Sequence, residues 1–340
     1  MSQPLWITEA DVVDLLSMSD AIDALTQGLR LEADGEARTM VKTHVTWGGG
    51  HTLHAIGATM EGQKLIGAKV WGHTAGGATP ILIIWDSESG ALAAIVEAFA
   101  LGQLRTGGMT GVATRLLAPT DADELAQIGS GRQALPQVAA VAAVRRLRRI
   151  RVFSPTRSNA EALATSLRAR LPAVEIVLAA DVESCVKDAP IVTVATRARE
   201  AFLRAAMLAR GTHLNAVGAI TPERKEFTQD IFDRADLLAT DSVQQVRRLS
   251  REFIQRFGTD DAAWQTVQPL SSLVQSGAGR PRGADLTVFK AMGIGLADLA
   301  LGARIYASAL HAGKGRPFSP PQRAMPRLWP EDSTTKGASK

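Results

Sequence analysis

The stretch IGSGRQAL, residues 128–135, follows the short apolar run ELAQ and precedes a segment rich in alanine and valine. Gly129 and Gly131 have the spacing of the turn between the first strand and first helix of a dinucleotide-binding unit, with Ala134 as the third small residue. The turn and the helix N-terminus would hold a pyrophosphate, whereas a purely structural turn is the alternative. We assign to the cofactor Gly129, Ser130, Gly131, Arg132 and Gln133.

From Pro119 onward, short apolar runs alternate with helical segments, which indicates βαβ units and a parallel sheet. Before it, residues 8–35 have helical spacing, with a break expected at Ser19 or Asp20, and residues 38–97 resemble antiparallel strands. Residues 101–118 return to helical spacing despite Gly107 and Gly108. The predicted fold class is α/β: a Rossmann-type dinucleotide-binding domain plus an α+β substrate-binding and dimerisation domain.

The segment RVFSPTRSN ends the second predicted strand of the dinucleotide-binding unit. NAD sites usually carry an acid here for the ribose 2′-hydroxyl, but none lies between Arg151 and Asn159. Hydroxyls and a guanidinium suit a 2′-phosphate instead, although a solvated loop arginine is the alternative. The sequence thus favours NADP(H) over NAD(H), with contacts from Ser154, Thr156 and Arg157.

Composition excludes several other classes of protein. The 340 residues include one cysteine, Cys185, so we expect no disulfide framework and no cysteine metal cluster, as is usual in the cytoplasm. No run reaches the roughly 18 apolar residues of a membrane span, and we expect no signal peptide. The basic run at residues 145–151 suggests nucleic-acid binding or a solvated helix end, and we favour the helix end. We therefore expect neither nucleic-acid nor membrane partners, and no metal.

Five motifs together resemble the ornithine cyclodeaminase/μ-crystallin family over about residues 5–318: RTGGMTGVATRLLA, IGSGRQA, VFSPTRSNAEALA, LNAVGAITPERKEF and DLTVFKAMGIGLADLA. The resemblance implies a central Rossmann domain, residues 119–304. It also implies a substrate-binding domain that forms a homodimer, residues 1–118 with 305–330. The polar residues 331–340 are expected to be a disordered tail.

The resemblance also implies a set of site residues. Lys69 and Arg105 match cationic positions that bind a substrate carboxylate, and Lys42 stands where an arginine is common. Cations in apolar segments need an anionic partner, although surface salt bridges are the alternative. Lys290 matches a position close to the cofactor, with a surface lysine as the alternative. We also assign to the cofactor Thr196, Val217 and Gly293.

One departure decides the predicted chemistry. Cyclodeaminases of this family carry an acid two positions before the proline of the ITPERKE segment, and here that position is Ile220. Isoleucine cannot hold an ammonium group or accept a proton. We therefore predict an NADPH-dependent reductase of small cyclic imino acids. The alternatives are a cyclodeaminase-like ammonia-lyase, an alanine dehydrogenase-like enzyme and a non-catalytic, crystallin-like binding protein.

Other polar residues receive secondary roles. His54 is the preferred candidate proton donor among three histidines of the β-rich region, the others being His44 and His73. Thr221 is placed against the substrate or the nicotinamide amide. Glu223 and Glu226 are expected on a solvated helix turn, and Cys185 as inert packing.

Overall fold

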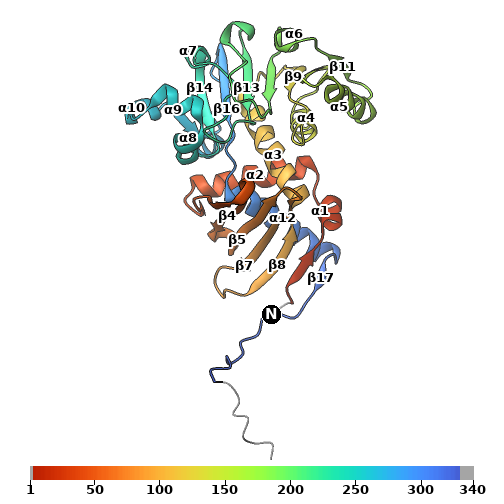
Figure 1. Cartoon of the computed structure of the whole chain (residues 1–340), viewed down its shortest axis with the longest axis vertical. Helices are drawn as coiled ribbons and strands as arrows, with labels where there is room; N and C mark the ends of the chain where they lie inside the picture. Colours follow the sequence, from red (N-terminus) through yellow and green to blue (C-terminus); the bar gives the residue numbers. More distant parts are fainter. Residues whose placement is uncertain (1–2, 330–340) are drawn as a thin grey trace, which may run out of the picture.

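The computed structural model describes residues 3–329, which form two sheet-based units joined by one long helix (Figure 1). The helix, α3 (Phe99–Leu117), contacts elements of both units. Its Gly107 allows this close packing, because a Cβ there would come within 2.7 Å of the Pro136 carbonyl oxygen. The predicted tail, residues 331–340, lies outside the described residues.

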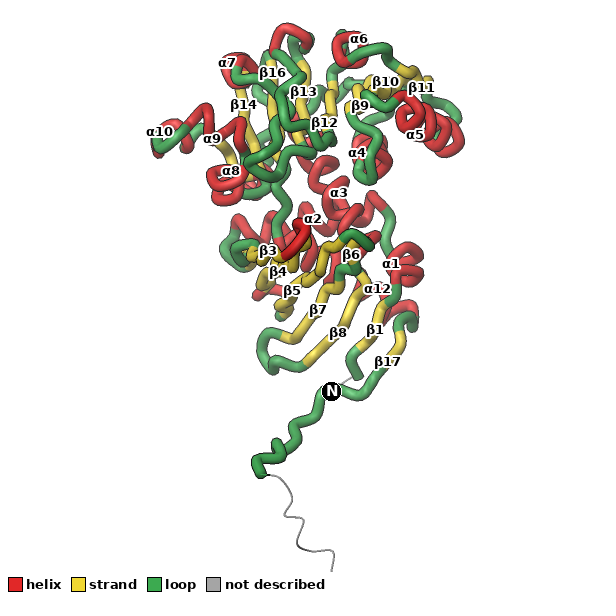
Figure 2. Tube along the Cα trace, viewed as in Figure 1, coloured by secondary structure: helices red, strands yellow, loops and turns green. Residues whose placement is uncertain are grey.

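The first unit is a mixed sheet in the order β17-β1-β8-β7-β5-β4-β2, with β3 and β6 paired at its side (Figure 2). Its strands are β1 (Leu5–Ile7), β2 (Ala37–Thr39), β3 (Thr43–Trp47), β4 (His51–Met60), β5 (Leu65–Thr74), β6 (Gly77–Ala78), β7 (Ile81–Asp86), β8 (Leu92–Glu97) and β17 (Arg316–Pro317). Its helices are α1 (Glu9–Leu15), α2 (Met18–Ala33) and α12 (Gly295–Ala312), with short 3-10 turns at Gly48–Gly50 and Glu61–Gln63. The antiparallel strands expected over 38–97 are confirmed.

The second unit is an eight-stranded parallel sheet in the order β11-β10-β9-β12-β13-β16-β14-β15. Its strands are β9 (Glu124–Ile128), β10 (Arg149–Phe153), β11 (Glu175–Leu178), β12 (Ile191–Val194), β13 (Thr212–Ala216), β14 (Ala235–Thr240), β15 (Val267–Pro269) and β16 (Leu286–Lys290). Its helices are α4 (Ala134–Ala142), α5 (Arg157–Arg170), α6 (Val182–Val186), α7 (Asp230–Arg234), α8 (Val243–Leu249), α9 (Arg251–Phe257), α10 (Asp261–Trp264) and α11 (Leu270–Ser276), with a 3-10 turn at Ala205–Met207. The predicted Rossmann-type sheet is confirmed.

The break between the first two helices falls slightly earlier than predicted. Ser17 caps α2: its hydroxyl accepts the Asp20 N–H, and the Asp20 carboxylate accepts the Ser17 N–H. A reciprocal capping box at Thr8 begins α1.

The last long helix, α12, belongs structurally to the first sheet. It packs on β4, β5 and β7, and Leu82 and Ile84 lie against its Gly302. Beyond α12, strand β17 pairs with β1 at the edge of the same sheet. The domain boundaries at 118/119 and 304/305 stay a prediction.

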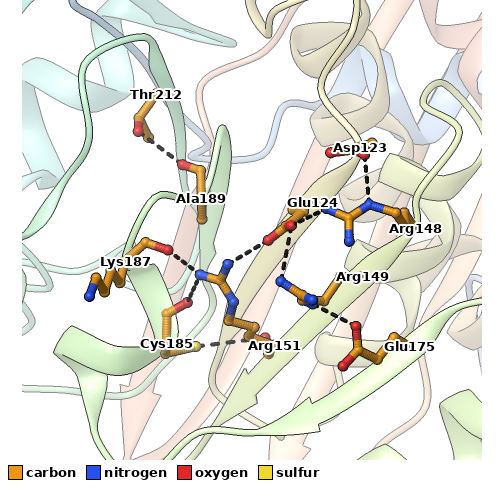
Figure 3. Close-up of polar contacts among 10 residues, drawn as sticks. All are labelled: Asp123, Glu124, Arg148, Arg149, Arg151, Glu175, Cys185, Lys187, Ala189 and Thr212. Atoms are coloured by element: carbon orange, nitrogen blue, oxygen red, sulfur yellow. Dashed lines mark hydrogen bonds and ion pairs between the residues drawn. The ribbon is translucent and has the colours of Figure 1, made fainter.

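The basic run does not end a helix, so that expectation was wrong. Helix α4 ends at Ala142, and the arginines lie in the following loop and in β10. Arg145 instead donates to the carbonyls of Thr114 and Ala118, and thus caps the C-terminus of α3. Three further arginines bind Glu124 (Figure 3).

Among residues 3–329, no helix is both long and apolar enough to cross a membrane. In the same residues, His, Cys, Asp and Glu side chains form no group of three or more suited to a metal ion.

Candidate active site

The glycine loop follows β9 and leads into α4, as its sequence predicted. Gly129 has φ +98°, a left-handed value that favours glycine, and a Cβ there would strike the Ala195 carbonyl oxygen. A Cβ at Gly131 would meet no described atom within 4 Å, which leaves space for a phosphate beside the backbone. The first turn of α4 contains no acid and Gln133 makes no side-chain cap, so these amides fit a pyrophosphate.

The loop after β10 keeps its cationic and hydroxyl character in the fold. Thr156 precedes α5 without capping it through its side chain, and the first turn of α5 has no acid. Arg157 is exposed, and its Nε lies 3.0 Å from Glu161 Oε1. Such an exposed ion pair is weak and can exchange for a phosphate. Ser154 is half-buried at the end of the strand.

Glu226 is fully buried, so the expectation that it lies on a solvated turn was wrong. One of its oxygens accepts the N–H and hydroxyl of Thr196, each at 2.8 Å. The other accepts the N–H groups of Gly218 and Ala219, both at 2.9 Å. Burial raises the pKa of the Glu226 carboxyl, against the effect of Lys290 and these donors. Glu226 therefore ties together the loops that follow β12 and β13.

Lys290 lies with Glu226 inside the protein rather than on the surface, which excludes the surface alternative. Its Nζ donates to the Ala219 carbonyl at 2.6 Å and lies 4.0 Å from Glu252 Oε2. Since its side chain is fully buried, Lys290 supports the cofactor-side loop from beneath. Thr196 is likewise held by Glu226, while Val217 is buried at the end of β13.

Lys69 and Arg105 meet at a third residue that sequence reasoning missed. Asp298, on the first turn of α12, accepts a hydrogen bond from Lys69 Nζ, and its Oδ1 lies 3.5 Å from Arg105 Nε. Lys69 comes from β5 and Arg105 from α3, so three elements build this pocket. The sequence did contain a signal: Asp298 is the only acid between Leu286 and Ala312, in an otherwise apolar helix.

Gly293, Gly295 and the buried Asp241 position the segment that leads to Asp298. A Cβ at Gly295 would collide with the backbone of Gly57 in β4, so α12 can begin this close to the sheet only with glycine. Asp241 accepts the N–H of Gly293 at 2.7 Å, and Gly293, with φ +84°, packs against the Arg105 guanidinium. The carboxyl edge of the parallel sheet therefore adjoins the cationic pocket.

A row of rings extends this pocket across three strands. His44, His54 and Trp71 are cross-strand neighbours, and the ring centroids of His54 and Trp71 are 4.7 Å apart. The ammonium groups of Lys69 and Lys42 lie 5.2 and 5.8 Å from the Trp71 ring centroid. Lys42 thus joins Lys69 and Arg105 at the pocket.

Burial is the largest cause of the pKa shifts of Lys69, Lys42 and His54. It lowers the pKa of Lys69 to about 8, with help from Arg105 and against Asp298. It also lowers the pKa of Lys42, where Arg105 adds repulsion. Burial, followed by the charge of Lys42, lowers the pKa of His54 to about 4. This histidine is therefore neutral at pH 7.

The segment with the decisive departure follows β13. Ile220 packs against the apolar core of the parallel-sheet unit, and Glu223 after the proline is exposed, as predicted. The Thr221 side chain hydrogen-bonds with Glu223, which lowers the pKa of that acid.

These features define an α/β protein whose Rossmann-type sheet adjoins a cluster of cationic side chains around Asp298. Residues 3–313 match the model of the ornithine cyclodeaminase/mu-crystallin family, and the chain belongs to this family. Its relatives include the alanine dehydrogenase of Archaeoglobus fulgidus, 24% identical over 92% of this chain and 97% of that protein. The Δ1-pyrroline-2-carboxylate reductase of Bacillus cereus is 27% identical over 69% of this chain and 72% of that protein.

Among solved structures, the fold is similar to that of Thermococcus litoralis Δ1-pyrroline-2-carboxylate reductase in complex with NADH and L-proline. The TM-score is 0.85 and the identity 25%, over 92% of this chain and all of that one. The prediction of an NAD(P)H-dependent oxidoreductase acting on C=N or CH–NH bonds is confirmed at the level of this enzyme class.

Proposed function

We propose that this protein is an NADPH-dependent reductase of small cyclic imino acids, such as Δ1-pyrroline-2-carboxylate or Δ1-piperideine-2-carboxylate. One observation carries the proposal: Lys69, Arg105 and Lys42 converge beside the carboxyl edge of the Rossmann sheet, whereas Ile220 is partly buried against the core. The pocket offers charge for a carboxylate, and position 220 offers no acid for releasing ammonia. Of the acids that follow it, Glu223 is exposed and Glu226 is bound by Thr196, Gly218 and Ala219.

The protein residues would hold the cofactor at its pyrophosphate and at its 2′-phosphate. The backbone of Gly129–Gly131 and the start of α4 would bind the pyrophosphate, while Ser154, Thr156 and Arg157 would bind the 2′-phosphate. Glu226 and Lys290 fix the loops around the nicotinamide through the backbone of Thr196 and Ala219.

At the substrate, Arg105 and Lys42 bind the carboxylate and Lys69 controls the proton. A lysine with a pKa of about 8 is mostly protonated at pH 7 and can still give up its proton, as a general acid must. The Lys69 proton goes to the imine nitrogen and gives the iminium form. When bound, NADPH would supply a hydride to the iminium carbon, the C=N π pair would become the nitrogen lone pair, and a cyclic amine and NADP⁺ would result.

The test is NADPH oxidation by the purified protein with a panel of substrates. Turnover of either cyclic imine, well above that of pyruvate plus ammonia and with no ammonia released from ornithine, is the expected result. Turnover of pyruvate plus ammonia instead would identify an alanine dehydrogenase-like enzyme, and ammonia from ornithine a cyclodeaminase. Bound NADPH without turnover of any substrate would favour a binding protein.

The preference for NADPH is the finer part of this proposal. It rests on the exposed Arg157 and on the absence of an acid between Arg151 and Asn159. Since the solved relative holds NADH, the two cofactors must be compared directly at saturating imine. A lower KM for NADH than for NADPH would contradict the preference.

We also propose a homodimer formed by the outer face of the first sheet. On the face away from α12, Val45 and Leu53 pair across β3 and β4 and are 57% and 45% exposed. The row continues through half-buried Val70 and Ile81, and exposed apolar patches of this kind mark interfaces. Light scattering should give a dimer mass for the native chain, and Leu53→Lys should give a monomer. A monomeric native chain would contradict the proposal.

A cytoplasmic location is proposed on composition alone, since the single Cys185 is free and buried and its pKa is raised by burial to about 12. A thiol of this kind is inert and needs no oxidising compartment.

A further inference from the structure

One carboxylate oxygen of Asp298, next to Lys69 and Arg105, lacks a hydrogen-bond partner among the described residues. Its side chain is 1% exposed, and Oδ1 takes both cationic contacts, from Lys69 and Arg105. Oδ2 is buried and has no hydrogen-bond partner within residues 3–329. Leaving a buried carboxylate oxygen without a donor is costly, so natural proteins rarely keep one without a use.

The charges around Asp298 determine which part of a substrate can meet Oδ2. The substrate carboxylate is repelled by Asp298 and attracted by Arg105 and Lys42, so it binds on their side. The opposite end of a planar imino acid presents its nitrogen, which carries an N–H when protonated. A donor with positive charge is the complement of a buried carboxylate oxygen.

Resting on the function proposed above, we propose that Asp298 Oδ2 accepts a hydrogen bond from the protonated nitrogen of the substrate. Asp298, already paired with Lys69 and Arg105, thereby holds the imine nitrogen but does not replace the acid that cyclodeaminases carry at the position of Ile220. This contact makes Asp298 a catalytic residue in this chain, one that holds the iminium form beside Lys69 and orients its carbon.

Gly295 determines how close the first turn of α12, and with it Asp298, lies to the sheet. The tight contact between Gly295 and the Gly57 backbone fixes the first turn of α12, and with it the depth at which Asp298 stands. The Asp241 carboxylate fixes the preceding turn by accepting the N–H groups of Met292 and Gly293, at 2.8 and 2.7 Å. Asp298 is therefore held in place before any ligand binds.

The test uses two ligands that differ only at the ring atom in question. Pyrrole-2-carboxylate presents an N–H where furan-2-carboxylate presents an oxygen, and both carry the same carboxylate. Calorimetric titration of the NADP⁺-saturated native protein should show pyrrole-2-carboxylate binding at least about tenfold more tightly. In Asp298→Asn the side-chain amide faces the ring, so this preference should disappear or invert.

Lys42→Met serves as the matched control, because it should weaken both ligands by a similar factor and keep the preference. Thermal melts of all three proteins check that Asp298→Asn is folded. If Asp298→Asn melts well below the native protein, Asp298→Glu replaces it, and a changed preference is again the expected result.

Three outcomes would overturn the inference. They are an unchanged preference in folded Asp298→Asn, equal binding of the two ligands to the native protein, and no binding of either ligand. Each is distinct from failure of the proposed function, which is read from imine turnover by the native protein. An active reductase with an unchanged ligand preference would keep the function and remove Asp298 from it.

Discussion

The amino edge of the parallel sheet and the pocket beside its carboxyl edge each gather three cationic side chains. At the amino edge, Arg148, Arg149 and Arg151 all bind Glu124, and Asp123 and Glu175 complete the charge balance (Figure 3). In the pocket, Asp298 is the acid within ion-pair distance of Lys69 and Arg105, the buried Asp241 lies near Arg105, and Lys42 adds a third positive charge. The first set is balanced by the protein itself, and the second is not.

This difference separates a structural cluster from a ligand site. Balanced ion pairs fix the starts of β9, β10 and β11 and leave no charge for a partner. An excess of buried cations destabilises the folded state until an anion arrives. Cationic residues that look alike in sequence are thus distinguished by whether the fold supplies their counter-charge.

The largest effect is expected at Lys69. Lys69→Met removes a pocket cation and the proposed proton donor, so kcat/KM for the imine should fall by about 10³-fold. Steady-state assays measure it, and Lys64→Met, which breaks an exposed ion pair with Glu88, is the control. Less than a tenfold loss would show that the pocket cations are as passive as those of the amino edge.

The pH profile gives a second readout of the same lysine. Because the protonated form is required, kcat/KM should decline as pH rises through the Lys69 pKa of about 8. Lys69→Arg, which stays charged, should retain some activity and lose this decline. A decline at the same pH in Lys69→Arg would assign it to another group.

Glu124→Gln tests the other side of the comparison. It leaves three arginines without their shared carboxylate, and partial exposure limits the loss to about 2 kcal/mol. This corresponds to a fall in Tm of about 5 °C, with kcat/KM unchanged. Glu61→Gln, in the exposed pair with Arg38, should lower Tm by much less. Lost activity in folded Glu124→Gln would show that the amino-edge cluster is not purely structural and would contradict the comparison.

Sequence patterns predicted most of the fold because its signals are local. The glycine turn at residues 129–131 and the alternation after Pro119 depend on neighbours within a few residues. The helix break, expected at Ser19 or Asp20, lies at Ser17. The site depends on contacts across the chain. Lys69 and Asp298 are 229 positions apart, and no local pattern joins them.

Glu226 is a second residue whose role could not be predicted from the local sequence. In the segment PERKEF it stands among charged residues, which is typical of a solvated turn. The chain instead turns inward there, because Phe227 packs in the core and the Glu226 carboxylate accepts four hydrogen bonds from two loops. Those donors lie on segments that follow separate strands, so only the assembled sheet reveals the role of Glu226.

Arg157 lies outside the pocket in an exposed ion pair with Glu161, and it extends the comparison to the cofactor. Arg157→Ala should raise the KM for NADPH by about tenfold and leave that for NADH nearly unchanged, because only NADPH carries the 2′-phosphate. Arg170→Ala, an exposed arginine at the other end of α5, is the control. Equal changes for both cofactors would show that Arg157 does not read the 2′ position.

The smallest effect is expected at His54, which lines the pocket without charge. Its pKa of about 4 means that no imidazolium forms there between pH 5 and 8, so His54→Asn should change kcat/KM by about threefold at most. The native profile should likewise contain no step near pH 6. Such a step, if removed by His54→Asn, would make this histidine a proton donor and place a fourth cation in the pocket. The pocket would then carry even more positive charge for Asp298 and the substrate carboxylate to balance.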